Sequence, residues 1–190
     1  METTGYAFVT GGASGIGRAC CLAFAKEGAR GLVVADINLD GTQETAAQAK
    51  ALAKDPGFRV DAIQVDVCVE ESVKTAVAHA AKYLGRIDYA VHSAGVSLPM
   101  AWCHSYAWLI HDQIPGGTFD PIAEASFADF KHLLDVNVNG TFLFNSLVSA
   151  AMKAQEPQQA SATDPTRGTT RGSIVNLSSV SEFMAVSNMV

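Results

Sequence analysis

Short apolar runs and longer amphipathic stretches alternate along the first half of the chain. Apolar runs at residues 6–9 and 31–36, the second closed by an acid, predict buried strands, and two further strands are predicted at residues 59–67 and 87–92. Stretches with apolar residues at helical spacing predict helices, and they cover residues 18–28, 41–54 and 70–84. This alternation predicts an α/β domain built on a doubly wound parallel sheet with helices on both faces.

A glycine-rich turn lies between the first predicted strand and the first predicted helix. It contains Gly11, Gly12, Gly15 and Gly17. Residues without side chains let the backbone approach a pyrophosphate, and the following helix N-terminus offers unpaired N–H groups to its charge. A glycine cluster alone is weak evidence, but a strand before it and a helix after it are the context that this chemistry needs. The turn therefore predicts a Rossmann-type dinucleotide site at the carboxyl ends of the strands.

Asp36 closes the second predicted strand, 19 residues beyond Gly17. At this distance a dinucleotide-binding fold has the carboxylate that accepts hydrogen bonds from the adenosine ribose. The alternative is a surface Asp at a strand end. Because a carboxylate here repels a 2′-phosphate, Asp36 favours NAD as the cofactor. Arg18 and Arg59 leave NADP open as the alternative.

Composition narrows the class of protein. The 190 residues suit one α/β domain, and a hydrophobic content of 48% supplies its core. The net charge of −6 argues against nucleic acid and against an anionic membrane as partners. No apolar run reaches the ~20 residues of a membrane-spanning helix, and the first strand begins too close to Met1 for a signal peptide. The four cysteines form no CxxC pair, so we expect a reduced, cytoplasmic protein.

These motifs resemble those of the classical short-chain dehydrogenase/reductase family. Residues 10–17, TGGASGIG, match the TGxxxGxG cofactor motif of that family, and Asp66 resembles its adenine-contacting acid. Residues 92–95, HSAG, stand where the family usually has NNAG, so both asparagines are replaced. The resemblance resumes at DVNVNGTF, residues 135–142, and at GSIVNLSS, residues 172–179.

The resemblance implies a role for each residue that matches a family motif. The implied cofactor-binding residues are Thr10, Gly11, Ser14, Gly15, Ile16, Gly17, Asp36, Asp66, Ser93, Ala94 and Gly95. Asn137 matches the asparagine that holds a proton-relay water, and Ser179, rather than Ser178, matches the serine that polarises the substrate oxygen. The family transfers hydride between a nicotinamide and a carbonyl or alcohol carbon. We therefore expect an oxidoreductase that uses NAD, or alternatively NADP, on a small-molecule carbonyl or secondary alcohol.

The general acid/base of the resembled family is a Tyr whose pKa is lowered by a Lys four residues later. A phenol with a pKa of ~10 is a poor base at neutral pH without such a cation. None of the four tyrosines in this chain has Lys at that position. The family spacing would put the pair at about residues 192–196. Residues 1–190 are thus expected to form a single but incomplete dinucleotide-binding domain, without the last strands and helices of the family and with an uncovered strand edge at Ser179.

Two long segments fall outside the resemblance. Residues 96–125 are expected to form an inserted loop over the substrate mouth, because long ordered loops usually carry function. The alternative is a segment without an evolved role. Its possible metal ligands match no recognised ligand spacing, so no metal is expected; they are Cys103, His104, His111 and Asp112. Residues 155–171 are polar and contain Pro, Gly and Thr, which predicts a mobile surface loop.

A long helix is predicted to begin at Ser126, which opens a sequence similar to a capping box. Its predicted apolar face consists of Phe127, Phe130, Leu133, Leu134, Val138 and Phe142. In the resembled family this helix also builds the dimer interface, which implies a homodimer or homotetramer.

Three functions remain open at this point. The first is an oxidoreductase, and family members with such insertions often resemble enzymes of natural-product pathways. The second is a dinucleotide-binding module that lacks catalysis. The third is a truncated remnant that neither folds stably nor binds a cofactor.

Overall fold

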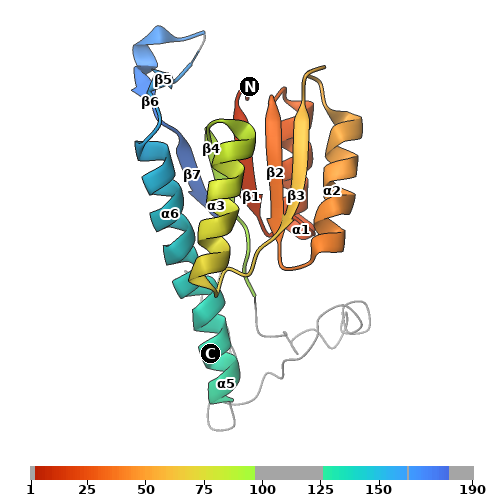
Figure 1. Cartoon of the computed structure of the whole chain (residues 1–190), viewed down its shortest axis with the longest axis vertical. Coiled ribbons are helices and arrows are strands. Elements are labelled where there is room, and N and C mark those ends of the chain that lie inside the picture. The colour runs from red at the N-terminus through yellow and green to blue at the C-terminus, as the bar shows by residue number, and fades with distance from the viewer. Residues whose placement is uncertain (1–2, 97–125, 162, 180–190) are drawn as a thin grey trace.

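The computed structural model describes residues 3–96, 126–161 and 163–179. Five parallel strands form its central sheet in the order β3-β2-β1-β4-β7 (Figure 1). The strands are β1 (Tyr6–Thr10), β2 (Gly31–Asp36), β3 (Arg59–Gln64), β4 (Tyr89–His92) and β7 (Ser173–Asn176). From β1 the chain adds β2 and β3 on one side of the sheet, and then β4 and β7 on the other side. This is the doubly wound sheet that the sequence predicts, and its switch point lies between β1 and β4.

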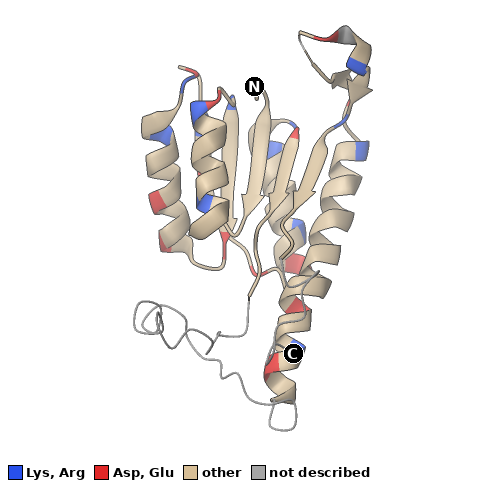
Figure 2. Ribbon diagram, turned by 180° about the vertical axis from the view of Figure 1, so that it is seen from behind, with Lys and Arg blue, Asp and Glu red and all other residues tan. Residues whose placement is uncertain are grey.

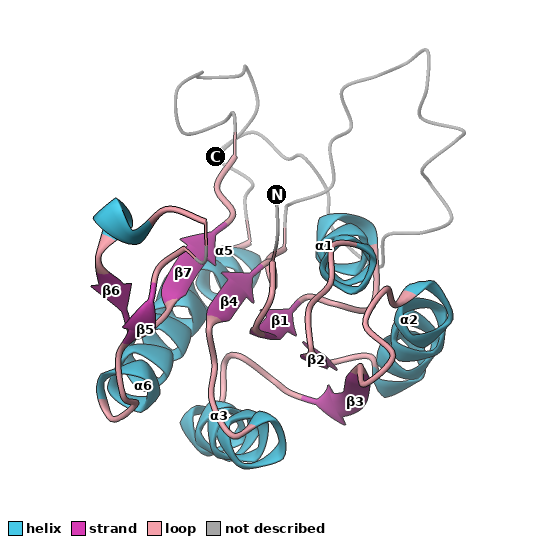
Figure 3. Ribbon diagram, turned by 90° about the horizontal axis from the view of Figure 1, so that it is seen from above, coloured by secondary structure: helices cyan, strands magenta, loops and turns pink. Residues whose placement is uncertain are grey.

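Helices cover both faces of this sheet, as Figure 3 shows from above. They are α1 (Gly15–Lys26), α2 (Leu39–Leu52), α3 (Glu70–Leu84) and α6 (Thr141–Lys153). Helix α5 (Phe127–Leu134) extends beyond the sheet (Figure 1) and buries none of its residues. Alternate residues of β1 face opposite layers. Phe8 packs in the cluster that includes α3 and α6, where its ring centroid lies 5.7 Å from that of Phe144. Ala7 and Val9 pack in the cluster that includes α1 and α2.

Element boundaries differ from the predictions by a few residues. The first strand continues to Thr10, and α1 begins at Gly15 rather than at residue 18. β3 ends at Gln64, because the chain then turns and the amide of Val69 donates to the carbonyl of Asp66. β4 begins at Tyr89, because the amide of Ile87 donates to the side chain of Gln155 instead of to a strand. Helix α3 has the predicted bounds, and Gly85 ends it with a left-handed φ of 82°.

The polar segment 155–171, which the sequence predicts to be a mobile surface loop, contains a short antiparallel hairpin. It pairs β5 (Gln158–Gln159) with β6 (Thr169–Thr170) and includes the 3₁₀ turn Pro165–Arg167. The Gln155 side chain fixes its base, since its amide nitrogen donates to the carbonyls of Ile87 and Arg171. Figure 1 shows the hairpin projecting beyond the end of α6.

The predicted long helix is formed by α5, a π-helical turn at Asp135–Gly140 (η1) and α6. Ser126 caps it as predicted, because its hydroxyl accepts from the amide of Asp129. Its buried residues are Val136, Gly140, Phe144, Val148 and Met152. Five of the six residues of the predicted apolar face are exposed, with 36–77% accessibility, and Leu133 is half-buried. The five are Phe127, Phe130, Leu134, Val138 and Phe142.

Charged residues of both signs are mixed along the outer helices (Figure 2). Among the residues that the structure describes, no helix is long and apolar enough to span a membrane, and no group of His, Cys, Asp or Glu could hold a metal. The four possible metal ligands of the 96–125 segment lie outside the described residues, as does nearly all of that segment and the chain from residue 180. β7 forms one edge of the described sheet, because it pairs only with β4 there.

Candidate functional site

The glycine-rich turn is shaped by two close backbone approaches. A Cβ on Gly17 would lie 2.0 Å from the carbonyl oxygen of Gly11. A Cβ on Gly11, whose φ is +66°, would lie 2.5 Å from the backbone of Ser93. Only glycine fits either position. The missing side chains therefore let the end of β1, the start of α1 and the segment after β4 meet at one point.

The N-terminus of α1 presents its amide groups without a side-chain cap. Ser14 is the N-cap residue, yet its hydroxyl accepts no bond from the first turn. Gly15 has a φ of +51°, and a Cβ there would meet nothing within 4 Å. An uncapped helix start beside open space suits an anion such as a pyrophosphate.

Asp36 ends β2 beside this turn. Its Oδ2 accepts from the amide of Ala13 at 3.1 Å, and its Oδ1 accepts from the amide of Asn38 at 3.0 Å. A carboxylate offers about four lone-pair directions, so these two bonds orient it and leave acceptor capacity for further partners. The two hydroxyls of a ribose are partners of the right kind.

One cleft of about 990 Å³ crosses the carboxyl ends of the strands. Eleven of the thirteen predicted site residues line it, and they are Gly11, Ser14, Gly15, Ile16, Asp36, Asp66, Ser93, Ala94, Gly95, Asn137 and Ser179. Asp36 ends β2 and Ser179 follows β7, and these two strands are three strand spacings apart in the sheet. At about 4.8 Å per spacing this is roughly 14 Å. The cleft therefore suits an extended ligand with chemically different ends.

Thr10 and Gly17 lie beneath the cleft and do not line it. Thr10 is buried, and its hydroxyl is hydrogen-bonded to Nδ1 of His92 at 2.8 Å. The His92 ring also stacks on Phe144, with 4.7 Å between centroids. Burial lowers the pKa of His92 to about 4. The hydrogen bond between Thr10 and His92 joins the ends of β1 and β4. Gly11 and Ser93, the next residues along the chain, continue from these ends into the site.

Further residues line the cleft that the sequence analysis did not name as site residues, among them Ile37, Cys68, His132 and Asp135. Ile37 and Cys68 follow strand ends, a position at which α/β folds bind ligands. Cys68 donates its amide to Asp66 Oδ1 at 2.9 Å. Burial and the neighbouring Asp66 raise the pKa of its thiol. His132 and Asp135 come from the α5–η1 segment; Asp135 opens the DVNVNGTF motif, whereas no sequence signal links His132 to this edge of the sheet.

Asn137 connects the π-helical turn to the segment after β4. Its Oδ1 accepts from the amide of Val96 at 2.9 Å, and its Nδ2 donates to the carbonyl of Val96 at 2.7 Å. The π turn widens the helix where this side chain leaves it, and such turns are frequent at functional sites. Ser178 and Ser179 follow β7 and line the same end of the cleft.

Comparison with known proteins gives one consistent family. The family described as short chain dehydrogenase matches residues 5–190. Short-chain dehydrogenase srdC of Neurospora crassa is 46% identical over 190 residues, which are all of this chain and 63% of that protein. Short-chain dehydrogenase fogB of Aspergillus ruber is 43% identical over the same shares. Human 3-hydroxyacyl-CoA dehydrogenase type-2 is 34% identical over 93% of this chain and 56% of that protein.

Solved structures agree on the fold. A short chain dehydrogenase from Mycobacterium smegmatis superposes with a TM-score of 0.73 at 22% identity, over 98% of this chain and 62% of that one. A short-chain type dehydrogenase/reductase from Mycobacterium ulcerans gives 0.67 at 23% identity, over 95% and 53%. The chain spans about 63% of the length of its similar fungal relatives. By the match of the family over nearly its whole length, this chain belongs to the short-chain dehydrogenases.

Proposed function

We propose that the cleft binds NAD in an extended form, as the cofactor site of an oxidoreductase. One observation carries the proposal: the uncapped start of α1 and the oriented carboxylate of Asp36 line the same cleft. The first suits a pyrophosphate and the second suits a ribose diol. An adenosine ribose at Asp36 and a pyrophosphate at Gly15 direct the other end of the ligand toward β7.

The remaining residues have proposed roles that follow this direction. Asp66 and Cys68 lie beyond Asp36 on the β3 side and would contact the adenine. The backbone of residues 93–95 would lie against the middle of the cofactor, where Gly11 packs closely on Ser93. Asn137 and Ser179 would lie at the nicotinamide end. Thr10 and Gly17 would support the cofactor site from below.

Two observations support NAD over NADP. Asp36 adds a negative charge where NADP carries its 2′-phosphate, and like charges repel. Both arginines that could offset this charge are bound elsewhere. Arg18 is paired with Glu44, and Arg59 donates to the carbonyl of Leu84 and lies over the rings of Tyr6 and Tyr83. Neither arginine lines the cleft.

The proposed reaction is hydride transfer between a nicotinamide and the carbonyl or secondary alcohol carbon of a small metabolite. The bound nicotinamide supplies the hydride acceptor or donor. The Ser179 hydroxyl would donate a hydrogen bond to the substrate oxygen and so stabilise the charge that develops on it. Asn137, held through Val96, would position the groups around this oxygen. A natural-product substrate stays a prediction, and so does the expected lid of residues 96–125.

Proton transfer is the step for which these residues offer no group of the family type. No Tyr among residues 1–190 has Lys four residues later, and an unassisted phenol is a weak base near neutral pH. We therefore expect residues 1–190 alone to bind the cofactor without steady turnover.

We also propose that the chain forms a homodimer through the exposed face of α5, η1 and α6. Five large apolar side chains of this segment are exposed, and Phe127 and Phe142 are 77% and 70% accessible. Exposed apolar side chains gathered on one element are typical of association surfaces. A reducing compartment such as the cytoplasm remains part of the proposal and is supported by the free thiols of Cys20, Cys21 and Cys68.

Fluorescence titration of the 190-residue protein with NADH tests the cofactor site. We expect saturable binding that ADP-ribose displaces, because ADP-ribose keeps the adenosine ribose and the pyrophosphate. Nicotinamide mononucleotide lacks the adenosine and should displace NADH poorly. Absence of saturable binding at millimolar NADH, or displacement by both fragments alike, would contradict the proposed orientation.

A further inference from the structure

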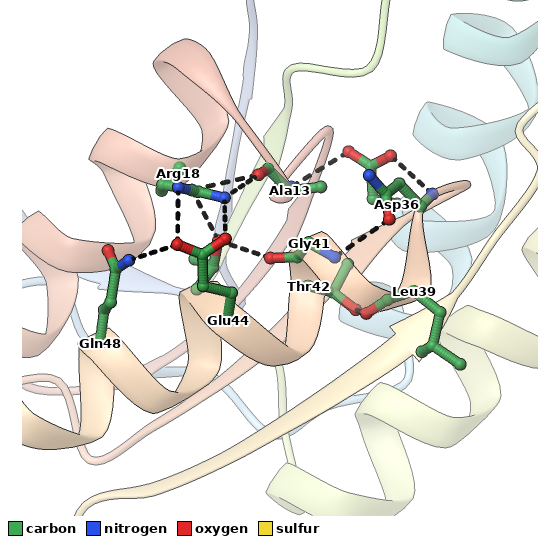
Figure 4. A network of polar contacts seen from close by, with 10 residues as sticks. Ala13, Arg18, Asp36, Leu39, Gly41, Thr42, Glu44 and Gln48 are labelled. Carbon is green, nitrogen blue, oxygen red and sulfur yellow. Dashed lines mark hydrogen bonds and ion pairs between the residues drawn. The ribbon is translucent and has the colours of Figure 1, made fainter.

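Two oppositely charged side chains hold the backbone of Ala13, one through its N–H and the other through its carbonyl oxygen (Figure 4). Its N–H donates to Asp36 Oδ2 at 3.1 Å. Its carbonyl oxygen accepts from Arg18, through Nη2 at 2.6 Å and Nε at 3.1 Å. One residue of the glycine-rich turn thus separates the carboxylate that faces the cleft from a guanidinium that does not line it.

Helix α2 holds this guanidinium in place. Glu44 Oε2 accepts from Arg18 Nη2 at 3.1 Å, and Thr45 Oγ1 accepts from Arg18 Nε at 3.0 Å. Gln48 in turn donates to Glu44 Oε1 at 3.0 Å. Asn38 also ties the helix to Asp36, because its side chain accepts from the amide of Gly41 at the helix start and its backbone amide donates to Asp36 Oδ1.

Of the acceptors bonded to Arg18, only Glu44 is charged. The guanidinium donates to the neutral carbonyl of Ala13 and the neutral hydroxyl of Thr45 as well, but only Glu44 adds the attraction of an opposite charge. A phosphate monoester carries about −1.5 to −2 charges near neutral pH. If Arg18 were bonded only to Ala13 and Thr45, a 2′-phosphate beside Asp36 would attract the guanidinium more strongly than these neutral acceptors do. The Glu44 carboxylate also attracts the guanidinium and so reduces the advantage of the phosphate.

We propose that Glu44, which lies outside the cleft, is a positioning residue for cofactor choice: it keeps Arg18 on the Ala13 carbonyl and away from the 2′ position of the adenosine ribose. This inference rests on the proposed NAD site and adds a second determinant to Asp36. Asp36 repels the 2′-phosphate directly, whereas Glu44 withholds the nearby cation that could bind it.

Titrations with NADH and NADPH test this role in four proteins: wild type, Glu44→Ala, Arg18→Ala and the double variant. We expect Glu44→Ala to bind NADPH up to about fivefold more tightly than wild type, because the gain is limited by the Arg18–Glu44 pair, whose Glu44 side chain is 59% exposed. Its NADH affinity should stay within about twofold. The double variant should lose the gain, because the gain requires the freed guanidinium. Arg18→Ala should weaken both cofactors alike, since it loosens the turn.

Asp40→Ala is the matched control, because Asp40 is an exposed acid in the first turn of the same helix and is not bonded to Arg18. An equal gain in NADPH affinity for Asp40→Ala, or a gain that persists in the double variant, would overturn the inference in favour of simple charge repulsion. An unchanged NADPH-to-NADH ratio in Glu44→Ala would also overturn it. If Glu44→Ala does not fold, Glu44→Gln must show a smaller gain in the same direction. Failure of wild type to bind either cofactor would instead reject the NAD site itself.

Discussion

Replacement of His92 by Asn should make the protein more resistant to mild acid. His92 is 2% exposed, bonded to Thr10 and stacked on Phe144. Its Nε2 has no hydrogen-bond partner among the described residues. A protonated imidazole would carry an N–H on both nitrogens, and here one of them would lack an acceptor. Burial therefore favours the neutral ring and lowers its pKa to about 4.

The direction of the pH effect follows from that pKa. The unfolded chain binds a proton at His92 near pH 6.5, whereas the folded chain binds it near pH 4. Between these values the unfolded state holds more protons, so acid favours unfolding. The penalty is absent above about pH 6.5 and grows to its full size near pH 4. At 1.36 kcal/mol per pKa unit, the fall from pH 7 to pH 5 is about 2 kcal/mol.

Urea denaturation at pH 7 and pH 5 measures this loss. The free energy of unfolding of wild type should fall by about 2 kcal/mol more than that of His92→Asn over the same interval. Other groups titrate in both proteins and cancel in the difference. His132→Asn is the matched control, since it removes an exposed imidazole instead of a buried one, and it should keep the wild-type pH dependence. Equal losses in wild type and His92→Asn would refute the argument that His92 is held neutral.

Three further predictions concern the cofactor turn and the helix surface. Asp36→Ala should weaken NADH binding by about tenfold or more while affecting NADPH much less, and equal losses in the two titrations would reject the ribose role. Gly17→Ala should abolish NADH binding and cost about 1–3 kcal/mol of stability, because its Cβ would clash with the Gly11 carbonyl; Gly57→Ala, at an exposed turn, should change neither. Phe142→Glu should convert a dimer to a monomer in sedimentation, and a monomeric wild type would show that this surface is not an interface.

The turn and its acid could be predicted because their information is local. The spacing from Gly11 to Gly17, set between a strand and a helix, determines which backbone groups face a ligand. The position of Asp36 follows from the strand that it ends. The glycine-rich turn joins β1 to α1, which follow one another in the sequence, and Asp36 ends β2, which pairs with β1 in the sheet.

The features that were missed depend on distant partners. Thr10 matches the cofactor motif, yet His92, 82 residues away, binds its hydroxyl below the cleft. The hairpin after α6 is anchored by Gln155 on Ile87, a contact between segments 68 residues apart. The π turn shifts the helical phase between α5 and α6, so a uniform 3.6-residue period could not say which apolar side chains face the sheet.

Amide hydrogen exchange with and without saturating NAD tests the central claim most directly, because it locates the ligand along the chain. We expect slower exchange at residues 13–18, 36–38 and 93–96, which surround the glycine-rich turn, and no change in the hairpin at 158–170. Protection confined to residues outside the cleft, or none at saturating NAD, would contradict a dinucleotide site at the carboxyl ends of these strands.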